Sequence, residues 1–204
     1  MVAPAHFHSI DKAIPAAGWN SIRNRVAQVA NALEDNQVLT VNLRGVGKDT
    51  TGDYLTYSRE QEKSLFTVHR KWPRSWPRTV TIKAPTDCPP VWDLFQRAAL
   101  LIASHYARVH SVEFKIITEG SYEGWCLAAK VASWATEDPI FEKESYLGAL
   151  VDSGYLAPAK EADGYAEWAV AAIDQPLFEI ATTAISPVGS APSVPWQGSI
   201  NWFF

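Results

Sequence analysis

Residues 90–117 read PVWDLFQRAALLIASHYARVHSVEFKII, and they carry the clearest pattern in the chain. Apolar residues recur every three or four positions between residues 91 and 106, which predicts a helix over Pro90–Val109 with a wide apolar face. Directly after it, apolar and polar residues alternate, which predicts a half-buried strand whose inward positions are Val112, Phe114 and Ile116. The stretch therefore predicts an amphipathic helix followed by a strand that it covers.

The same two patterns recur on both sides of this stretch. Apolar spacing predicts further helices over residues 19–35, 125–134, 141–152 and 161–173. Alternation predicts strands over residues 38–43, 54–57, 65–68 and 79–82. Residues 44–53 contain three glycines and are predicted to form a loop, whereas residues 177–185 fit a helix or a strand. We expect an α+β fold in which an antiparallel sheet of four to six strands carries packed amphipathic helices.

Length and composition are those of one globular domain. The chain has 204 residues, of which 47% are hydrophobic and 20% are charged. We expect a single domain over residues 1–186 and a Pro-, Ser- and Gly-rich arm over residues 187–204. The arm ends in apolar residues that we expect to dock on the domain or on a partner: Trp202, Phe203 and Phe204. No apolar run is long enough for a membrane span and the first residues lack a signal-peptide pattern, so we expect no membrane contact and a cytoplasmic location.

The two halves of the chain differ in charge. Residues 1–112 carry 14 Lys and Arg against 9 Asp and Glu, and residues 113–204 carry 4 against 13. The positive charge concentrates in residues 69–78, HRKWPRSWPR, where Trp-Pro-Arg occurs twice. Proline excludes a regular helix there, and alternating guanidinium and indole groups suit an acidic protein surface or stacked bases. The predicted binding residues are Arg70, Lys71, Trp72, Arg74, Trp76 and Arg78, with Trp202, Phe203 and Phe204 of the arm.

Two other interpretations of this basic segment remain open. A crossover loop would place its tryptophans on the core and leave its arginines in water or paired with the acidic half of the chain. Nucleic-acid binding is disfavoured, because such proteins carry a basic excess over a whole face and this chain has one short patch. An acidic protein is therefore the expected partner.

One candidate nucleophile is present. Cys126 lies near a predicted helix start, where the helix dipole lowers a thiol pKa, and the nearest upstream histidines are His105 and His110. A small hydrolase or transferase that uses this cysteine with a histidine is thus an alternative function. Cys126 is also flanked by Trp125 and Leu127, as a buried small hydrophobic residue would be. The only two cysteines lie far apart, so we expect no disulfide framework, no metal and no cofactor.

Two further motifs match known chemistry incompletely. A phosphate loop at residues 45–50 would need a glycine where Asn42 stands and a hydroxyl residue where Asp49 stands. Glu113-Phe114-Lys115 has the Glu-x-Lys form of metal-dependent nucleases. Its possible second ligands, Asp87 and Asp93, stand at a helix start and not on a neighbouring strand. Neither motif predicts a function here.

The order of elements resembles the TY-Chap and YbjN group, which has a type III secretion chaperone-like α+β fold. Trp19 heads an amphipathic helix, and the strands at residues 38–43 and 54–57 are similar to that group's first hairpin. A later stretch is similar to that group's Leu-Gly-Trp…Pro segment, with Tyr155 in place of tryptophan. It contains Leu147, Leu150, Ser153-Gly154-Tyr155 and Pro158. The resemblance implies a non-catalytic, protein-binding role as a chaperone or an immunity-like partner. We therefore expect a non-enzymatic protein-interaction module.

Overall fold

A computed structural model describes residues 6–39, 41–49, 52–59, 65–71, 80–82 and 90–158. These residues form an α+β fold, as expected. The helices are α1 (Ala16–Asp35), α2 (Pro90–Val109), α3 (Tyr122–Thr136) and α4 (Glu144–Asp152), with a short 3₁₀ helix η1 (Pro139–Glu142). The strands are β1 (His6–Ile10), β2 (Val41–Asp49), β3 (Gly52–Arg59), β4 (Leu65–His69), β5 (Val80–Ile82), β6 (Phe114–Thr118) and β7 (Leu156–Pro158).

The strands divide between two sheets. One sheet has the order β5-β1-β6-β7, in which β1 is antiparallel to both neighbours and β7 is parallel to β6. The other is an antiparallel meander in the order β2-β3-β4. The expected single antiparallel sheet is therefore not what the described residues form. The parallel pair arises because α3 and α4 lie between β6 and β7, and this connection is long enough to return the chain in the same direction.

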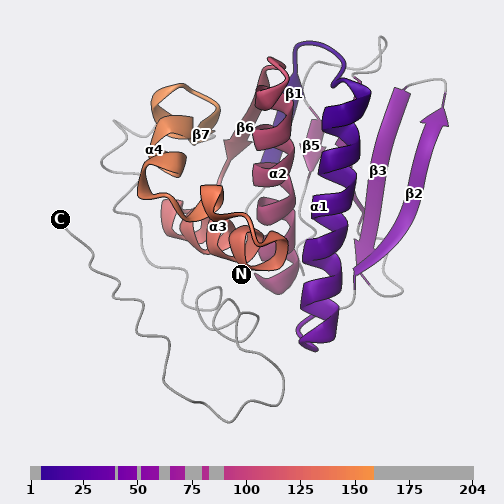
Figure 1. Cartoon of the computed structure of the whole chain (residues 1–204), viewed down its shortest axis with the longest axis horizontal. Helices are drawn as coiled ribbons and strands as arrows, with labels where there is room; N and C mark the ends of the chain where they lie inside the picture. Colours follow the sequence, from indigo (N-terminus) through magenta and orange to yellow (C-terminus); the bar gives the residue numbers. More distant parts are fainter. Residues whose placement is uncertain are drawn as a thin grey trace.

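Helix α2 is the centre of the molecule. In Figure 1 it stands beside α1, with α3 near its lower end, β1, β5 and β6 behind it, and β2 and β3 on the far side of α1. Every residue from Trp92 to Ser104 is buried, so neighbours surround this part of the helix on all sides. The helix meets both sheets: Phe95 contacts the rings of Tyr57 and Phe66, and the Ser104 hydroxyl donates to the carbonyl oxygen of Phe114 on β6 at 3.3 Å. This central helix positions the polar groups described below.

The glycine-containing stretch over residues 44–53 is not the predicted loop. Strand β2 runs through it to Asp49 and pairs with β3, which begins at Gly52. The register shifts between Leu43 and Gly45, and such a bulge keeps two long strands paired where glycine weakens the alternation pattern. The glycines thus belong to a hairpin.

Two strands and one helix boundary also differ from the prediction. Strands β1 and β7 were not predicted, since five and three residues give too short an alternation to stand out. The helix predicted over residues 141–152 is η1 followed by α4, separated at Lys143, whose backbone is extended. The predicted helix at residues 161–173, the ambiguous residues 177–185 and the arm at 187–204 lie outside the described residues.

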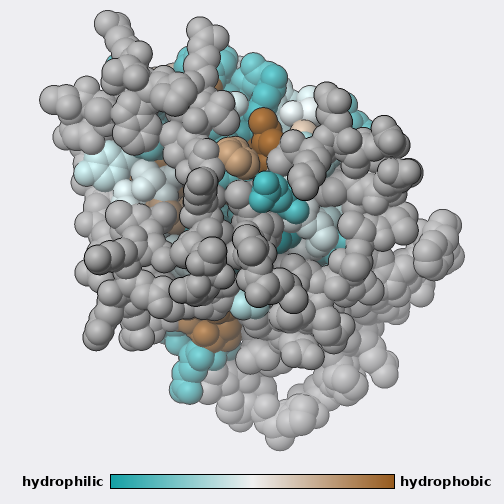
Figure 2. Space-filling model, turned by 180° about the vertical axis from the view of Figure 1, so that it is seen from behind, coloured by the Kyte–Doolittle hydropathy of each residue, from teal (hydrophilic) through white to brown (hydrophobic). Residues whose placement is uncertain are grey.

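The described surface is mostly polar. On the face seen in Figure 2, hydrophobic colour appears only in small separate areas among the described residues. Val109, at 62% exposure, is the one large hydrophobic side chain recorded as exposed in that part of the chain. No helix among the described residues has the length and apolar character that a membrane span requires.

Candidate functional site

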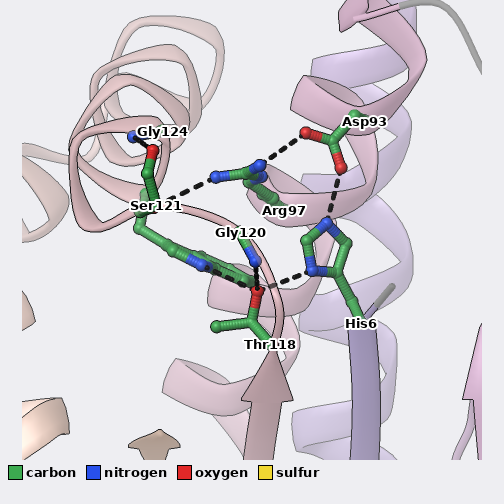
Figure 3. A network of polar contacts seen from close by, with 8 residues as sticks. His6, Asp93, Arg97, Thr118, Gly120, Ser121 and Gly124 are labelled. Atoms are coloured by element: carbon green, nitrogen blue, oxygen red, sulfur yellow. Dashed lines mark hydrogen bonds and ion pairs between the residues drawn. The ribbon is translucent and has the colours of Figure 1, made fainter. Parts of the chain in front are cut away.

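Five buried polar or amphipathic side chains converge where β1 begins, β6 ends and helices α2 and α3 start (Figure 3). None of them is more than 2% exposed. We call them the His6 cluster, and its members are His6, Asp93, Arg97, Thr118 and Trp125. Buried groups of this kind must satisfy one another, because water does not reach them.

A chain of short hydrogen bonds crosses the cluster through one imidazole. His6 Nε2 lies 2.5 Å from Asp93 Oδ1, and His6 Nδ1 lies 2.8 Å from the hydroxyl oxygen of Thr118. The three groups come from β1, α2 and β6, so the contacts tie three elements together. Their order, hydroxyl to imidazole to carboxylate, is the order found in Ser-His-Asp hydrolases.

The hydroxyl of Thr118 decides where the protons lie. Its oxygen accepts the backbone N–H of Gly120 at 2.9 Å and the indole N–H of Trp125 at 3.3 Å. A hydroxyl oxygen has two lone pairs, so both are in use and the third contact must be made by the hydroxyl proton. Thr118 therefore donates to His6 Nδ1, and His6 donates from Nε2 to Asp93. The imidazole is the neutral Nε2–H tautomer.

Arg97 completes the cluster from the next turn of α2. Its Nη2 lies 2.7 Å from Asp93 Oδ2, and its Nη1 donates to the carbonyl oxygen of Ser121 at 3.2 Å. The guanidinium carbon also lies 5.6 Å from the centre of the Trp125 ring. Arg97 therefore neutralises the buried carboxylate and joins α2 to the start of α3, where Ser121 caps the helix by accepting from Gly124.

The pKa shifts agree with this proton arrangement. Burial lowers the pKa of His6 and outweighs the nearby Asp93 carboxylate, which keeps the imidazole neutral. Burial alone would raise the pKa of Asp93, but the Arg97 guanidinium and the contacts with His6 outweigh it and hold that pKa below its ordinary value. The cluster therefore contains one ion pair, Asp93–Arg97, and a neutral histidine.

The closed geometry argues against catalysis by Thr118. A nucleophilic hydroxyl needs an electron pair that can reach a substrate, and both lone pairs of this oxygen accept N–H groups. Thr118 and His6 are each 0% exposed. The cluster holds β1, β6, α2 and α3 together through hydrogen bonds and one ion pair among its own side chains.

Cys126, the candidate nucleophile, lies half-buried in α3. Burial raises the pKa of its thiol to about 11, with a further contribution from the Glu123 carboxylate. A thiol in this state is protonated at neutral pH and is a poor nucleophile. Among the described residues, no hydrogen bond joins it to an imidazole.

The two histidines proposed as its partner have other neighbours. His105 packs in a ring cluster with Tyr106, Phe141 and Tyr146, and burial lowers its pKa. His110 lies against the start of α1, where a Cβ atom on Gly18 would come within 2.4 Å of its ring. The geometry therefore gives no support to a Cys–His site.

Two of the predicted binding residues are described. Arg70 and Lys71 follow β4, with Arg70 half-buried and Lys71 exposed. Arg70 Nε donates to the carbonyl oxygen of Ile14 at 2.7 Å, and the Ile14 N–H donates to the carbonyl oxygen of Arg70 at 2.9 Å. The other predicted binding residues lie outside the described part of the chain: Trp72, Arg74, Trp76, Arg78, Trp202, Phe203 and Phe204.

The nuclease-like motif is a surface ion pair. Lys115 Nζ lies 2.7 Å from Glu113 Oε1, and both side chains are nearly half exposed. Asp93 lies at the other end of β6, beside Thr118, and does not join them. In the part of the chain that the structure describes, no three His, Cys, Asp or Glu residues gather as metal ligands.

Gly120 shows how tightly the cluster is packed. A Cβ atom at this position would lie 2.6–2.9 Å from the guanidinium of Arg97. We expect Gly120→Ala to lower the free energy of unfolding by about 1–3 kcal/mol, since the buried guanidinium would have to move away from Asp93. Urea unfolding of the full chain measures it.

Gly148 in α4 is the matched control for that substitution. A Cβ atom there meets no other atom within 4 Å. We expect Gly148→Ala to raise the free energy of unfolding by about 0.5–1 kcal/mol, because alanine has less freedom to lose in a helix. Equal effects of the two substitutions would contradict the packing described for the cluster.

Comparison of the chain with protein-family models, with curated proteins and with solved structures finds no match. The resemblance to the TY-Chap and YbjN group therefore stays a prediction, and the function is argued from the residues alone.

Proposed function

We propose that this chain is a non-catalytic protein-binding module that recognises an acidic partner through the basic segment, residues 70–78. Two properties of the described residues support this function. The ionisable groups of the His6 cluster bind one another, and the thiol of Cys126 has a pKa raised to about 11. The groups available for recognition are therefore those of the surface.

The single observation that carries the proposal is the double hydrogen bond between Arg70 and Ile14. It fixes the start of the basic segment to the connection between β1 and α1, with Lys71 exposed beside it. A segment whose first residue is held in place loses less conformational freedom when it binds. Charge complementarity with an acidic surface then raises the association rate and the specificity of binding.

The described tryptophans narrow the choice of aromatic binding residues. Trp19, Trp92 and Trp125 are at most 5% exposed, and Trp134 packs against the core. The four lie in the interior or pack against it, so the total of nine tryptophans does not by itself indicate a binding surface. The aromatic residues proposed for the surface are those of the basic segment, Trp72 and Trp76, with Trp202, Phe203 and Phe204 in the arm. A chaperone- or immunity-like role in the cytoplasm is the form of this function that we propose.

Charge reversal tests the proposal. We expect Lys71→Glu/Arg74→Glu to weaken binding of a fluorescent Glu-rich peptide by about tenfold or more at low salt, since two attractive charges become repulsive. Fluorescence anisotropy measures the affinity. The control, Arg23→Glu/Lys143→Glu, makes the same change in net charge at exposed positions on α1 and beside α4. Equal losses in both variants would contradict a specific surface.

A single-stranded oligo-dT probe of equal charge separates protein from nucleic-acid recognition. The proposal predicts weaker binding of oligo-dT than of the peptide. Tighter binding of oligo-dT, with an affinity that falls steeply as salt rises, would replace the proposal with nucleic-acid binding.

A further inference from the structure

The basic segment lies in the chain between two strands that both meet the start of β1. Strand β4 ends at His69, whose ring stacks with that of His8 at 6.3 Å between centroids. Strand β5 pairs with β1 through His6, Phe7 and His8. Among the described residues, β1 is the only strand with which β5 pairs. The three residues His6–His8 therefore hold the chain on both sides of residues 70–79.

Two of these three residues are histidines at 0% and 1% exposure. His8 stacks against Phe114 with ring centroids 5.2 Å apart and an interplanar angle of 7°. Burial, together with the neighbouring His69, lowers the pKa of His8 to about 3. The folded chain thus keeps the His8 imidazole neutral well below the pH at which a free imidazole takes up a proton, and burial lowers the pKa of His6 in the same direction.

The hydrogen bonds of the His6 cluster leave no place for a second proton on His6. Protonation at Nδ1 would place an N–H against the Thr118 oxygen, which already accepts Gly120 and Trp125. The charged groups that face His6 are Asp93 and Arg97 from α2, and Glu119 after β6. Asp93 and Glu119 both act to raise the pKa of His6, but burial outweighs them, and Arg97, which pairs with Asp93 at 2.7 Å, acts in the same direction as burial.

We propose that His6 and His8 form a pH-sensitive anchor: their protonation releases the start of β1 together with β5, and thereby frees the β5 side of the basic segment, while Arg70 keeps its hydrogen bonds with Ile14. In the released state each imidazole is exposed and takes up a proton near its ordinary pKa of about 6.5. The anchored state binds neither proton, so its stability relative to the released state falls as the pH drops below that value. The consequence for partner binding rests on the proposed function, whereas the release itself does not.

Native-state hydrogen exchange of the full chain tests the release. Between pH 7 and pH 5, His8 alone is expected to raise the opening constant of the β5 amides about 25-fold, after correction for intrinsic exchange. His6, whose pKa is also lowered, is expected to increase the opening constant further. The β5 amides that pair with β1 are expected to exchange faster than amides in the middle of α2 at both pH values. Identical rates for β5 and α2 would show global unfolding alone and would overturn the proposal.

Two variants show whether the faster exchange of the β5 amides at pH 5 comes from the anchor histidines. His8→Phe keeps a ring against Phe114 but removes one titrating group, so the increase is expected to become smaller by a factor of about 25. His105→Phe removes another histidine of lowered pKa, one that packs on Phe141 and Tyr146, and is expected to leave the β5 increase unchanged. An unchanged increase in His8→Phe would overturn the role of His8. Loss of acidic-peptide binding would leave these exchange results intact, so the two proposals fail separately.

Discussion

Replacing Arg97 by methionine is expected to lower the free energy of unfolding by about 3–5 kcal/mol. Methionine fills a similar space but leaves the Asp93 carboxylate, at 2% exposure, without its cation. The carbonyl oxygen of Ser121 also loses its donor. Since small domains are stable by only about 5–15 kcal/mol, this variant is close to unfolding. Urea unfolding at neutral pH measures the loss.

A double-mutant cycle shows whether the loss comes from the ion pair. Asp93→Asn alone leaves the guanidinium of Arg97 uncompensated and is expected to cost a similar amount. Asp93→Asn/Arg97→Met removes both charges, so it is expected to cost at least about 2 kcal/mol less than the sum of the single variants. Additive losses would contradict the buried ion pair. If Arg97→Met alone does not fold, the double variant is expected to fold, and this rescue gives the same answer.

Thr118→Val is expected to lower the free energy of unfolding by about 3–5 kcal/mol, although the side chain keeps its shape. The hydroxyl makes three contacts, with Gly120, Trp125 and His6, and valine makes none of them. Two buried N–H donors and one imidazole nitrogen would be left unsatisfied, at about 1–3 kcal/mol each before the structure relaxes. Thermal or urea unfolding measures the change.

Two threonine variants are the controls for this prediction. Thr118→Ser keeps the hydroxyl and loses one methyl group, so a cost of about 1 kcal/mol is expected. Thr67→Val removes a half-buried hydroxyl that contacts the hydroxyl of Thr56, at 3.0 Å across β3 and β4. Its cost is expected to stay below about 1 kcal/mol. If Thr118→Val costs no more than Thr67→Val, the hydroxyl is not the centre of the cluster.

The helices were the predictable part of the fold, because their apolar faces extend over several turns. Residues 90–109 and 19–35 were predicted within a few residues of α2 and α1. The division into two sheets was not predictable in this way. Which strands pair depends on contacts between distant parts of the chain, as in β1 and β6, whose paired residues are more than 100 positions apart. A local pattern carries no information on such pairing.

The His6 cluster was missed for the same reason. Asp93 was considered only as a possible nuclease ligand. Its spacing of four from Arg97 in a strongly apolar helix is the one local sign of a buried ion pair. His6 and Thr118 lie in segments 112 positions apart, and the strand that holds His6 was not predicted. Only the fold brings them together.

The number of tryptophans in a sequence does not show whether their indole rings are exposed or buried. A surplus of indole groups favoured a binding surface, yet the four tryptophans in the described residues belong to the interior or pack against it. Two of them, Trp92 and Trp125, rank among the largest side chains that are fully buried. The charge pattern is the better guide to a surface, since an exposed cation such as Lys71 has no role in the core.

The positions of the protons in the His6 cluster decide whether its hydrogen bonds are closed as described. The NMR chemical shifts of the His6 ring nitrogens report these positions directly. A two-dimensional NMR spectrum that correlates imidazole nitrogens with ring protons, taken at pH 7, distinguishes the two neutral tautomers from the imidazolium. We predict a neutral ring that carries its proton on Nε2, with Nδ1 accepting from Thr118. A proton on Nδ1, or a charged ring at that pH, would contradict the closed cluster.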